Sequence, residues 1–171
     1  MVIMGKCFIM MPNHILTDLN KLILFSYGNQ NTKITGGWAS SGYELSGYTN
    51  MQACSIVGQY INVPRNNTSD VVDIFGTVNS FNVSEYKTLH VVYFMTGNNA
   101  NSGLRCSLGD SKTSSYTSEF PYGGETVYLN TLYDYTFDIT DLSGYKYFEI
   151  HNHWAGGCTW GKVYEVYLTK F

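Results

Sequence analysis

Large apolar side chains alternate with polar ones along several short stretches of the chain. In residues 133–139 Tyr, Tyr, Phe and Ile take every second position, with Asp, Thr and Asp between them. This period of two is typical of a β-strand with one buried and one solvated face. Residues 146–150 and 164–168 alternate similarly, whereas residues 89–95 are apolar on both faces apart from His90. Residues 89–95 are therefore predicted to lie in the middle of a sheet.

Five further apolar runs of strand length occur along the rest of the chain. The segments between the runs are rich in Gly, Asn, Ser and Pro, the residues that form tight turns. Helix is predicted only as single turns, around residues 17–20 and 140–143. Many short strands without a long helix or a repeat predict an all-β fold, an antiparallel β-sandwich of jelly-roll type. The five runs are residues 22–27, 52–57, 71–75, 104–108 and 125–129.

Residues 1–21 differ in composition from the rest of the chain. Four of the six methionines lie in the first eleven residues, and Pro12 separates them from the remainder of the segment. An apolar arm packs against its own domain or a neighbouring subunit, because alone it would expose an apolar patch. We therefore predict an N-terminal arm or linker at residues 1–21, a route to a homo-oligomer, and a β-sandwich binding domain at residues 22–171. The arm contains no recognisable signal peptide, and its apolar run is too short to span a bilayer.

Composition narrows the classes of protein to which the chain can belong. Its 171 residues can bury a core without disulfides or a structural metal. Aromatic residues (16%) outnumber charged residues (13%), which favours half-buried strands over solvated helices. The net charge of -3 is spread without long runs of one sign, and phosphate binding needs clustered Lys and Arg. Nucleic acid is therefore excluded as a partner, and neither a cofactor nor a membrane is predicted.

The four cysteines have two interpretations. Cys7, Cys54, Cys106 and Cys158 are far apart and show no CxxC or CxxH spacing, so their pattern indicates no zinc site. The favoured interpretation is buried thiols in a reducing compartment. The alternative is one disulfide in an extracellular setting.

Three segments carry a resemblance to known domains. They are FSYGNQNTKITGGW at residues 25–38, FDITDLSGYKYFEI at residues 137–150 and KVYEVYL at residues 162–168. Their arrangement resembles jelly-roll domains of the carbohydrate-binding-module or galactose-binding-like kind, which occur in phage virion proteins and gut-bacterial surface proteins. The resemblance implies a non-catalytic module on a virion or bacterial cell surface, with glycans or other surface proteins as partners.

The predicted loop after Ile150, residues 151–161, combines more rings and side-chain donors than any other stretch of the chain. Trp faces stack on the C–H groups of sugars, and Asn and His side chains bond to sugar hydroxyls. A Gly/Ser-rich segment near Trp38 and Tyr43 is either a second stacking platform or a lid over the core. The alternative for Trp154 and Trp160 is that they close one end of the sandwich. The candidate ligand-binding residues are Trp38, Tyr43, His151, Asn152, His153, Trp154 and Trp160.

Two groups of residues could hold a metal, and the sequence leaves metal binding open. In an extended strand His151 and His153 would project from one face and could share an ion with Cys158, although no further ligand is identifiable. Asp138 and Asp141 could hold calcium, but Asp141 is equally explained as a turn cap.

Tyrosines at alternate positions also predict a contact surface. Tyr145, Tyr147 and Tyr167 fall on the outward positions of strands whose inward positions are apolar. Such a tyrosine-rich face is typical of contact with a partner, either a glycan or another subunit.

The evidence for catalysis is limited to one pair of carboxylates. The sequence contains no GxSxG, P-loop, GxGxxG or HExxH motif. If the last two strands formed a hairpin, Glu149 and Glu165 would lie ~5 Å apart, as in a retaining glycosidase. Successive jelly-roll strands often belong to different sheets, so both are predicted to be solvated face residues. We therefore predict that the chain is not an enzyme.

The sequence thus predicts a surface-displayed binding or decoration module of a phage virion or bacterial surface. It would adhere to glycans through loop aromatics. The alternative is a structural virion subunit that makes protein contacts through its arm and tyrosine-rich face, and a glycoside hydrolase is less favoured.

Overall fold

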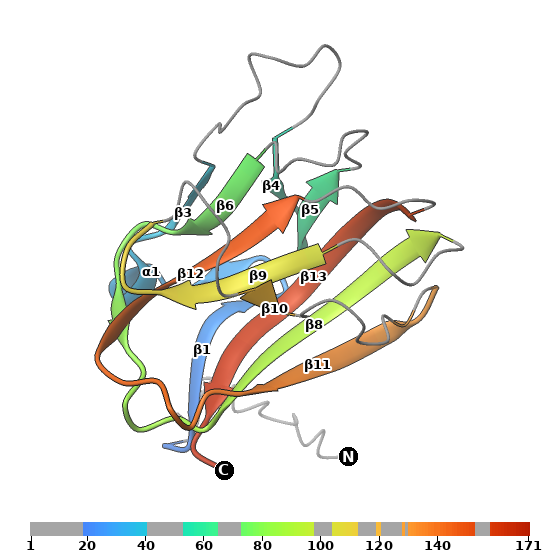
Figure 1. The fold of residues 1–171 in the computed structure, drawn as a ribbon. Coiled ribbons are helices and arrows are strands. Elements are labelled where there is room, and N and C mark those ends of the chain that lie inside the picture. The colour runs from blue at the N-terminus through green and yellow to red at the C-terminus, as the bar shows by residue number, and fades with distance from the viewer. Residues whose placement is uncertain are drawn as a thin grey trace, which may run out of the picture.

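The chain folds into two antiparallel β-sheets that pack face to face (Figure 1). The computed structural model describes residues 19–40, 53–64, 73–97, 104–112, 119–120, 128, 130–152 and 158–171. In this described part of the chain the one helix is α1 (Thr32–Thr35), a single turn. The prediction of an all-β sandwich is confirmed, whereas the predicted arm lies almost wholly outside the described residues.

Sheet 1 contains seven strands in the described part of the chain. Its longest strand lies at the centre, and different neighbours pair with the two halves of that strand on one side. The order across the sheet is β11 (Leu132–Asp138), β8 (Thr88–Gly97), β13 (Cys158–Thr169), β1 (Lys21–Ser26) and β2 (Asn29–Gln30). Beside the first half of β13 lies β5 (Tyr60–Pro64), which pairs in turn with β4 (Ser55–Val57).

Sheet 2 contains six strands among the described residues. Its order is β10 (Glu119–Phe120), β9 (Leu104–Gly109), β12 (Tyr145–Asn152), β6 (Asp73–Thr77) and β3 (Trp38–Ser40), with β7 (Phe81–Asn82) beside the first residues of β12. The main strands alternate between the two sheets along the chain, which is the crossing pattern of a jelly-roll sandwich. In Figure 1, sheet 2 lies in front of sheet 1.

The core fills the space between the inner faces of the sheets. Phe148 and Ile150 from β12, and Val166 and Leu168 from β13, are all 0% exposed. Burying each such side chain contributes about 1.5–3 kcal/mol relative to leaving it in water. The prediction that residues 89–95 lie mid-sheet is confirmed, because β8 lies between β11 and β13.

Two features of β13 differ from the sequence prediction. Residues 158–161, predicted as loop, begin this strand, because Gly161 pairs with both Val63 on β5 and Met95 on β8. The alternation of residues 164–168 predicted Tyr164 on the same face as Val166, and this was wrong. The reason is a β-bulge, which shifts the register at Tyr164.

Candidate functional site

Three tyrosine rings meet on the outer face of sheet 1, over the middle of β13. The ring centroid of Tyr164 lies 5.9 Å from that of Tyr27 and 5.8 Å from that of Tyr60. The ring planes are tilted by 48° and 56°, within the range in which aromatic pairs attract. We refer to Tyr27, Tyr60 and Tyr164 as the tyrosine cluster.

A β-bulge in β13 turns Tyr164 towards the outer face. Val163 pairs with Tyr93 and Glu165 pairs with Val92, so Tyr164 is an extra residue relative to β8. Val163 is fully buried, and so is the residue that follows Glu165, whereas Tyr164 and Glu165 are both partly exposed. A bulge allows two consecutive side chains to share one face of a strand, and it often lies beside a functional site.

The other two rings come from hairpins that meet at the bulge. Tyr27 lies in the turn between β1 and β2, and Tyr60 begins β5 after the turn from β4. The two turns touch, because a Cβ on Gly28 would collide with the carbonyl oxygen of Gly58. The backbone N–H of Tyr27 donates to the carbonyl of Tyr164 at 2.8 Å. Three elements therefore fix the geometry of the cluster.

Tyr27 has an unusual backbone conformation for a tyrosine. Its φ is 45° and that of Gly28 is 88°, which together form a two-residue hairpin turn. Turns with two positive φ angles favour Asn-Gly or Gly-Gly. A left-handed conformation costs a residue with a Cβ roughly 1–2 kcal/mol. The Tyr27 ring is also 47% exposed, and strain of this kind is concentrated at functional positions.

Charged and hydroxyl groups lie beside the cluster. The Nζ of Lys162 lies 4.5 Å from the centroid of the Tyr60 ring. On the other side, the hydroxyl of Ser26 donates to Oε1 of Glu165 at 2.8 Å. This bond leaves further acceptor sites on the carboxylate, because an ionised carboxylate has about four. The surface therefore combines aromatic faces with both a donor and an acceptor.

A second aromatic group on the same outer face consists of Tyr167 and His90, and its tyrosine ring is covered by neighbouring side chains. The rings of Tyr167 and His90 stack at 4.3 Å and 10°, and the Nζ of Lys21 lies 3.4 Å from the Tyr167 centroid. At these separations the two neighbours must occupy opposite faces of the Tyr167 ring. The hydroxyl of Tyr167 donates to Asp134 at 2.9 Å, and Nδ1 of His90 lies 3.1 Å from the same carboxylate.

Burial, the hydrogen bond to Asp134 and nearby negative charge raise the pKa of Tyr167, so its hydroxyl keeps its proton. The prediction of one tyrosine-rich face was wrong. Tyr145 and Tyr147 belong to β12 in sheet 2, whereas Tyr167 belongs to β13 in sheet 1, on the opposite side of the sandwich. Both faces of the Tyr167 ring are also covered.

A hollow of about 80 Å³ lies on the outer face of sheet 2. Ala39, Gly76 and Glu149 form one row across β3, β6 and β12. Glu149 is 4% exposed, so the prediction that it is solvated was wrong. Its strand lies between β9 and β6, and its neighbour in the row, Ser107, is also buried. The lining residues are Ala39, Ser40, Ile74, Gly76, Thr77, Lys112 and Glu149.

A buried aspartate supports the strands beside this hollow. The Asp73 carboxylate is 0% exposed and accepts bonds from the Ser40 hydroxyl and the Cys54 backbone N–H, both at 2.5 Å. Asp73 therefore links the last residue of β3, Ser40, to the residue that precedes β4, Cys54. Burial and the charge of Asp73 raise the pKa of the Cys54 thiol.

The predicted ligand-binding residues have different places in the structure. Trp38 packs against the core, with its ring centroid 5.9 Å from Phe25 and from Phe75 and 5.7 Å from Phe148. This geometry fits the lid interpretation better than the stacking platform. His151 and Asn152 end β12, and Trp160 lies near the start of β13, but their side chains lie outside the described part. Tyr43, His153 and Trp154 also lie outside the described residues.

The strand ends that flank the predicted loops lie at one end of the sandwich. Asn152 pairs with both Asp73 and Leu104, and Cys158 pairs with Gly97. The sequence reasoning missed the tyrosine cluster, and the one available signal was Tyr27-Gly28 at a turn position where Asn-Gly is usual.

Catalysis by the carboxylate pair is not supported by the topology. Glu149 lies on β12 in sheet 2 and Glu165 on β13 in sheet 1, so the last two strands form no hairpin. Among the described residues no three His, Cys, Asp or Glu side chains gather as a metal site. Cys54 and Cys106 are buried thiols, whereas Cys7 and the Cys158 side chain lie outside the described residues, so the interpretation of the four cysteines stays a prediction. No helix among the described residues has the length and apolarity to cross a membrane.

Comparisons with known proteins add little to this picture. No protein-family model matches the chain, and no curated protein matches its sequence. Among solved structures, the secreted serine protease VesC from Vibrio cholerae matches with a TM-score of 0.44 and 10% identity. The match covers 69% of this chain and 23% of the protease chain. A similarity of this level carries no argument about fold or activity.

Proposed function

We propose that this chain is a non-catalytic binding module that holds a glycan on the tyrosine cluster. The observation that carries the proposal is the meeting of Tyr27, Tyr60 and Tyr164 at a bulge and a strained turn on an outer face. Exposed aromatic rings on a rigid strand scaffold are suited to the C–H faces of sugars. The proposal moves the main contact from loop aromatics to sheet 1.

The groups around the cluster match the hydroxyl groups of a sugar. Glu165 can accept bonds from hydroxyl hydrogens, and the ammonium of Lys162 can donate to hydroxyl oxygens. The Lys162 ammonium lies over the Tyr60 ring, and Glu165 accepts a hydrogen bond from Ser26 next to Tyr27. A neutral glycan therefore finds donors, acceptors and stacking surface within one small area.

The setting remains the one that the sequence resemblance implies, a phage virion or a bacterial surface. There the module would act by adhesion, because many copies of a weak site gain avidity without new contacts. Finding the coding region beside capsid or tail genes would support this setting. A neighbourhood of intracellular metabolic genes would contradict it.

A glycan array followed by titration tests the proposed function. Tyr164→Ala removes the central ring, and we expect it to weaken binding of the best array ligand by about tenfold or more, roughly 1.4 kcal/mol. The matched control is Tyr145→Ala, because Tyr145 is 64% exposed on the other sheet. Equal affinity of the Tyr164→Ala variant and the unchanged protein would refute the proposal, and so would an array without any ligand.

A second candidate function is that of a structural virion subunit. It is favoured by the position of β11, which in the described part of the chain pairs with β8 alone and exposes Leu132 at 53%. Such an edge can accept a strand from another subunit. If the chain has this function, light scattering should detect an oligomer, and Leu132→Lys should dissociate it. A strictly monomeric chain would exclude this function.

A further inference from the structure

The hollow on sheet 2 lies on the face opposite the tyrosine cluster. Its floor is the row Ala39, Gly76 and Glu149, which crosses three neighbouring strands. Gly76 leaves space there, because a Cβ at this position would lie 2.9 Å from Cγ of Glu149 and would collide with the Phe148 carbonyl oxygen. The hollow is therefore a consequence of strand register and of one residue without a side chain.

The lining of the hollow combines three kinds of surface. Ala39 and Ile74 supply apolar surface, the buried Glu149 supplies a carboxylate, and Lys112 supplies an ammonium group. Glu149 already has an interaction within the protein. Because a carboxylate offers about four acceptor sites, it can accept another bond from a ligand.

The two charges restrict which ligands fit. An anion would be repelled by Glu149 and a cation by Lys112, and a purely apolar group would remove water from both charged groups without replacing its hydrogen bonds. A small neutral group with one donor, one acceptor and an apolar end matches all three surfaces. The volume of about 80 Å³ suits a group of a few heavy atoms, since a single water needs about 10–15 Å³.

We infer that this hollow binds the acetamido group of an N-acetylated sugar. The amide N–H of the ligand donates to Glu149, its carbonyl oxygen accepts from Lys112, and its methyl group contacts Ala39 and Ile74. This inference goes beyond the proposed glycan binding, because it adds a second ligand site on a different sheet, built from different residues. The chain would then carry one stacking site and one site selective for an acetamido group.

Saturation-transfer NMR with N-acetylglucosamine and glucose as probes tests the inference. We expect saturation of the acetyl methyl protons, and binding of glucose at least tenfold weaker. Ala39→Leu should abolish the preference by filling the hollow, and it leaves the fold intact because Ala39 is exposed on the short strand β3. Lys112→Ala should also weaken binding, whereas Lys33→Ala, another exposed lysine, is the matched control.

The outcomes separate this inference from the proposed function. The inference is overturned if N-acetylglucosamine and glucose bind equally, or if Ala39→Leu, folded by circular dichroism, keeps the preference. Binding of N-acetylglucosamine should persist in Tyr164→Ala. If Tyr164→Ala instead removes it, the acetamido sugar binds the tyrosine cluster, and the hollow is not the site.

Discussion

The backbone of Tyr27 gives the sharpest prediction at the scale of single residues. A residue kept in a strained conformation contributes more to function than to stability. Tyr27→Asn places the preferred Asn-Gly pair in the turn. We expect the melting temperature to change little, because Asn adopts the left-handed conformation more readily than Tyr and relieves part of the strain of about 1–2 kcal/mol, which offsets the lost ring contact of about 0.5–1.5 kcal/mol. Glycan affinity should fall in the same variant.

Thermal unfolding and titration of the Tyr27→Asn variant measure the two quantities separately. A marked loss of stability with unchanged affinity would mean that the Tyr27 ring is a packing residue. Tyr60→Ala is a useful comparison, because Tyr60 loses the same kind of contact without a positive φ. It should therefore lower both the stability and the affinity.

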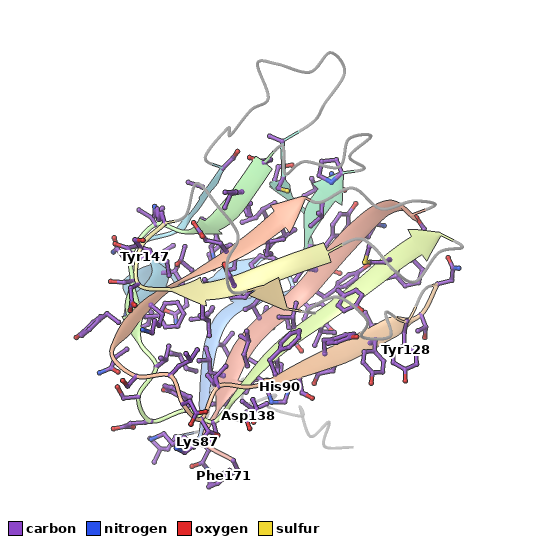
Figure 2. The ribbon with its side chains drawn as sticks, viewed as in Figure 1. Lys87, His90, Tyr128, Asp138, Tyr147 and Phe171 are labelled. Carbon is purple, nitrogen blue, oxygen red and sulfur yellow. The ribbon has the colours of Figure 1, made fainter. Side chains whose placement is uncertain are left out.

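Asp138 makes the stability of the fold depend on pH. It lies at the end of the sandwich opposite to Asn152 and Cys158. Figure 2 shows it near Lys87 and Phe171. Hydrogen bonds from the side chain and backbone of Thr140, with the charge of Lys87, lower the pKa of Asp138 below its ordinary value of 3.8. The folded state therefore favours the ionised form. Its stabilisation is present above pH 3.8 and is lost as the pH falls through the lowered pKa.

Asp138→Ala should consequently lower the melting temperature at pH 7. The difference from the unchanged protein should shrink as the pH is lowered below 3.8. Melting curves of both proteins between neutral and acidic pH measure this convergence. A difference that stays constant down to the most acidic pH would show that the Asp138 carboxylate contributes through its shape and not its charge.

The contact between two hairpin turns can be tested at the scale of elements. Gly28 and Gly144 both have positive φ angles, 88° and 75°, so alanine is strained at both positions. A Cβ on Gly144 meets nothing within 4 Å, whereas one on Gly28 collides with the carbonyl oxygen of Gly58. Gly28→Ala should therefore force the β1–β2 and β4–β5 turns apart, which Gly144→Ala cannot do.

We expect Gly144→Ala to cost about 1–2 kcal/mol, the left-handed penalty alone. Gly28→Ala should cost clearly more and should also weaken glycan binding, because Tyr27 lies in one of the turns that separate and Tyr60 directly follows the other. Denaturant unfolding of both variants gives the two free energies. Equal losses would show that the turns do not support each other.

The elements also show where sequence reasoning succeeds and where it fails. Strand β11 could be predicted because its alternation of large and polar side chains is uninterrupted, and its inner residues Tyr135 and Phe137 are indeed buried. The same reasoning failed at Tyr164, because one bulged residue inverts the alternation on one side of it. Gly161 was predicted as loop, but it lies inside strand β13, where it pairs with both Val63 and Met95.

The site was less predictable than the fold for a related reason. Tyr27, Tyr60 and Tyr164 are separated along the sequence and meet only through the pairing of β13 with both β1 and β5. Periodicity describes one strand at a time and contains no information on which strands become neighbours. The sequence therefore indicated that aromatic residues would be exposed, but not which of them would meet.

At the scale of the whole molecule, the alternation of strands between sheets separates the two proposed sites. The tyrosine cluster belongs to the outer face of sheet 1 and the hollow to the outer face of sheet 2, with the core between them. Packed sheets lie about 10 Å apart, so side chains on opposite outer faces share no contacts. Substitutions at the two sites should then have additive effects on stability.

A double-mutant cycle with Tyr164→Ala and Glu149→Gln measures this independence. We expect the two losses in the free energy of unfolding to add within about 0.3–0.5 kcal/mol. Tyr164 and Glu165 are adjacent, so the cycle of Tyr164→Ala with Glu165→Gln provides the coupled comparison. If the distant pair coupled as strongly as the adjacent pair, the core would transmit changes between the two faces. The two ligand sites would then have to be treated as one linked system.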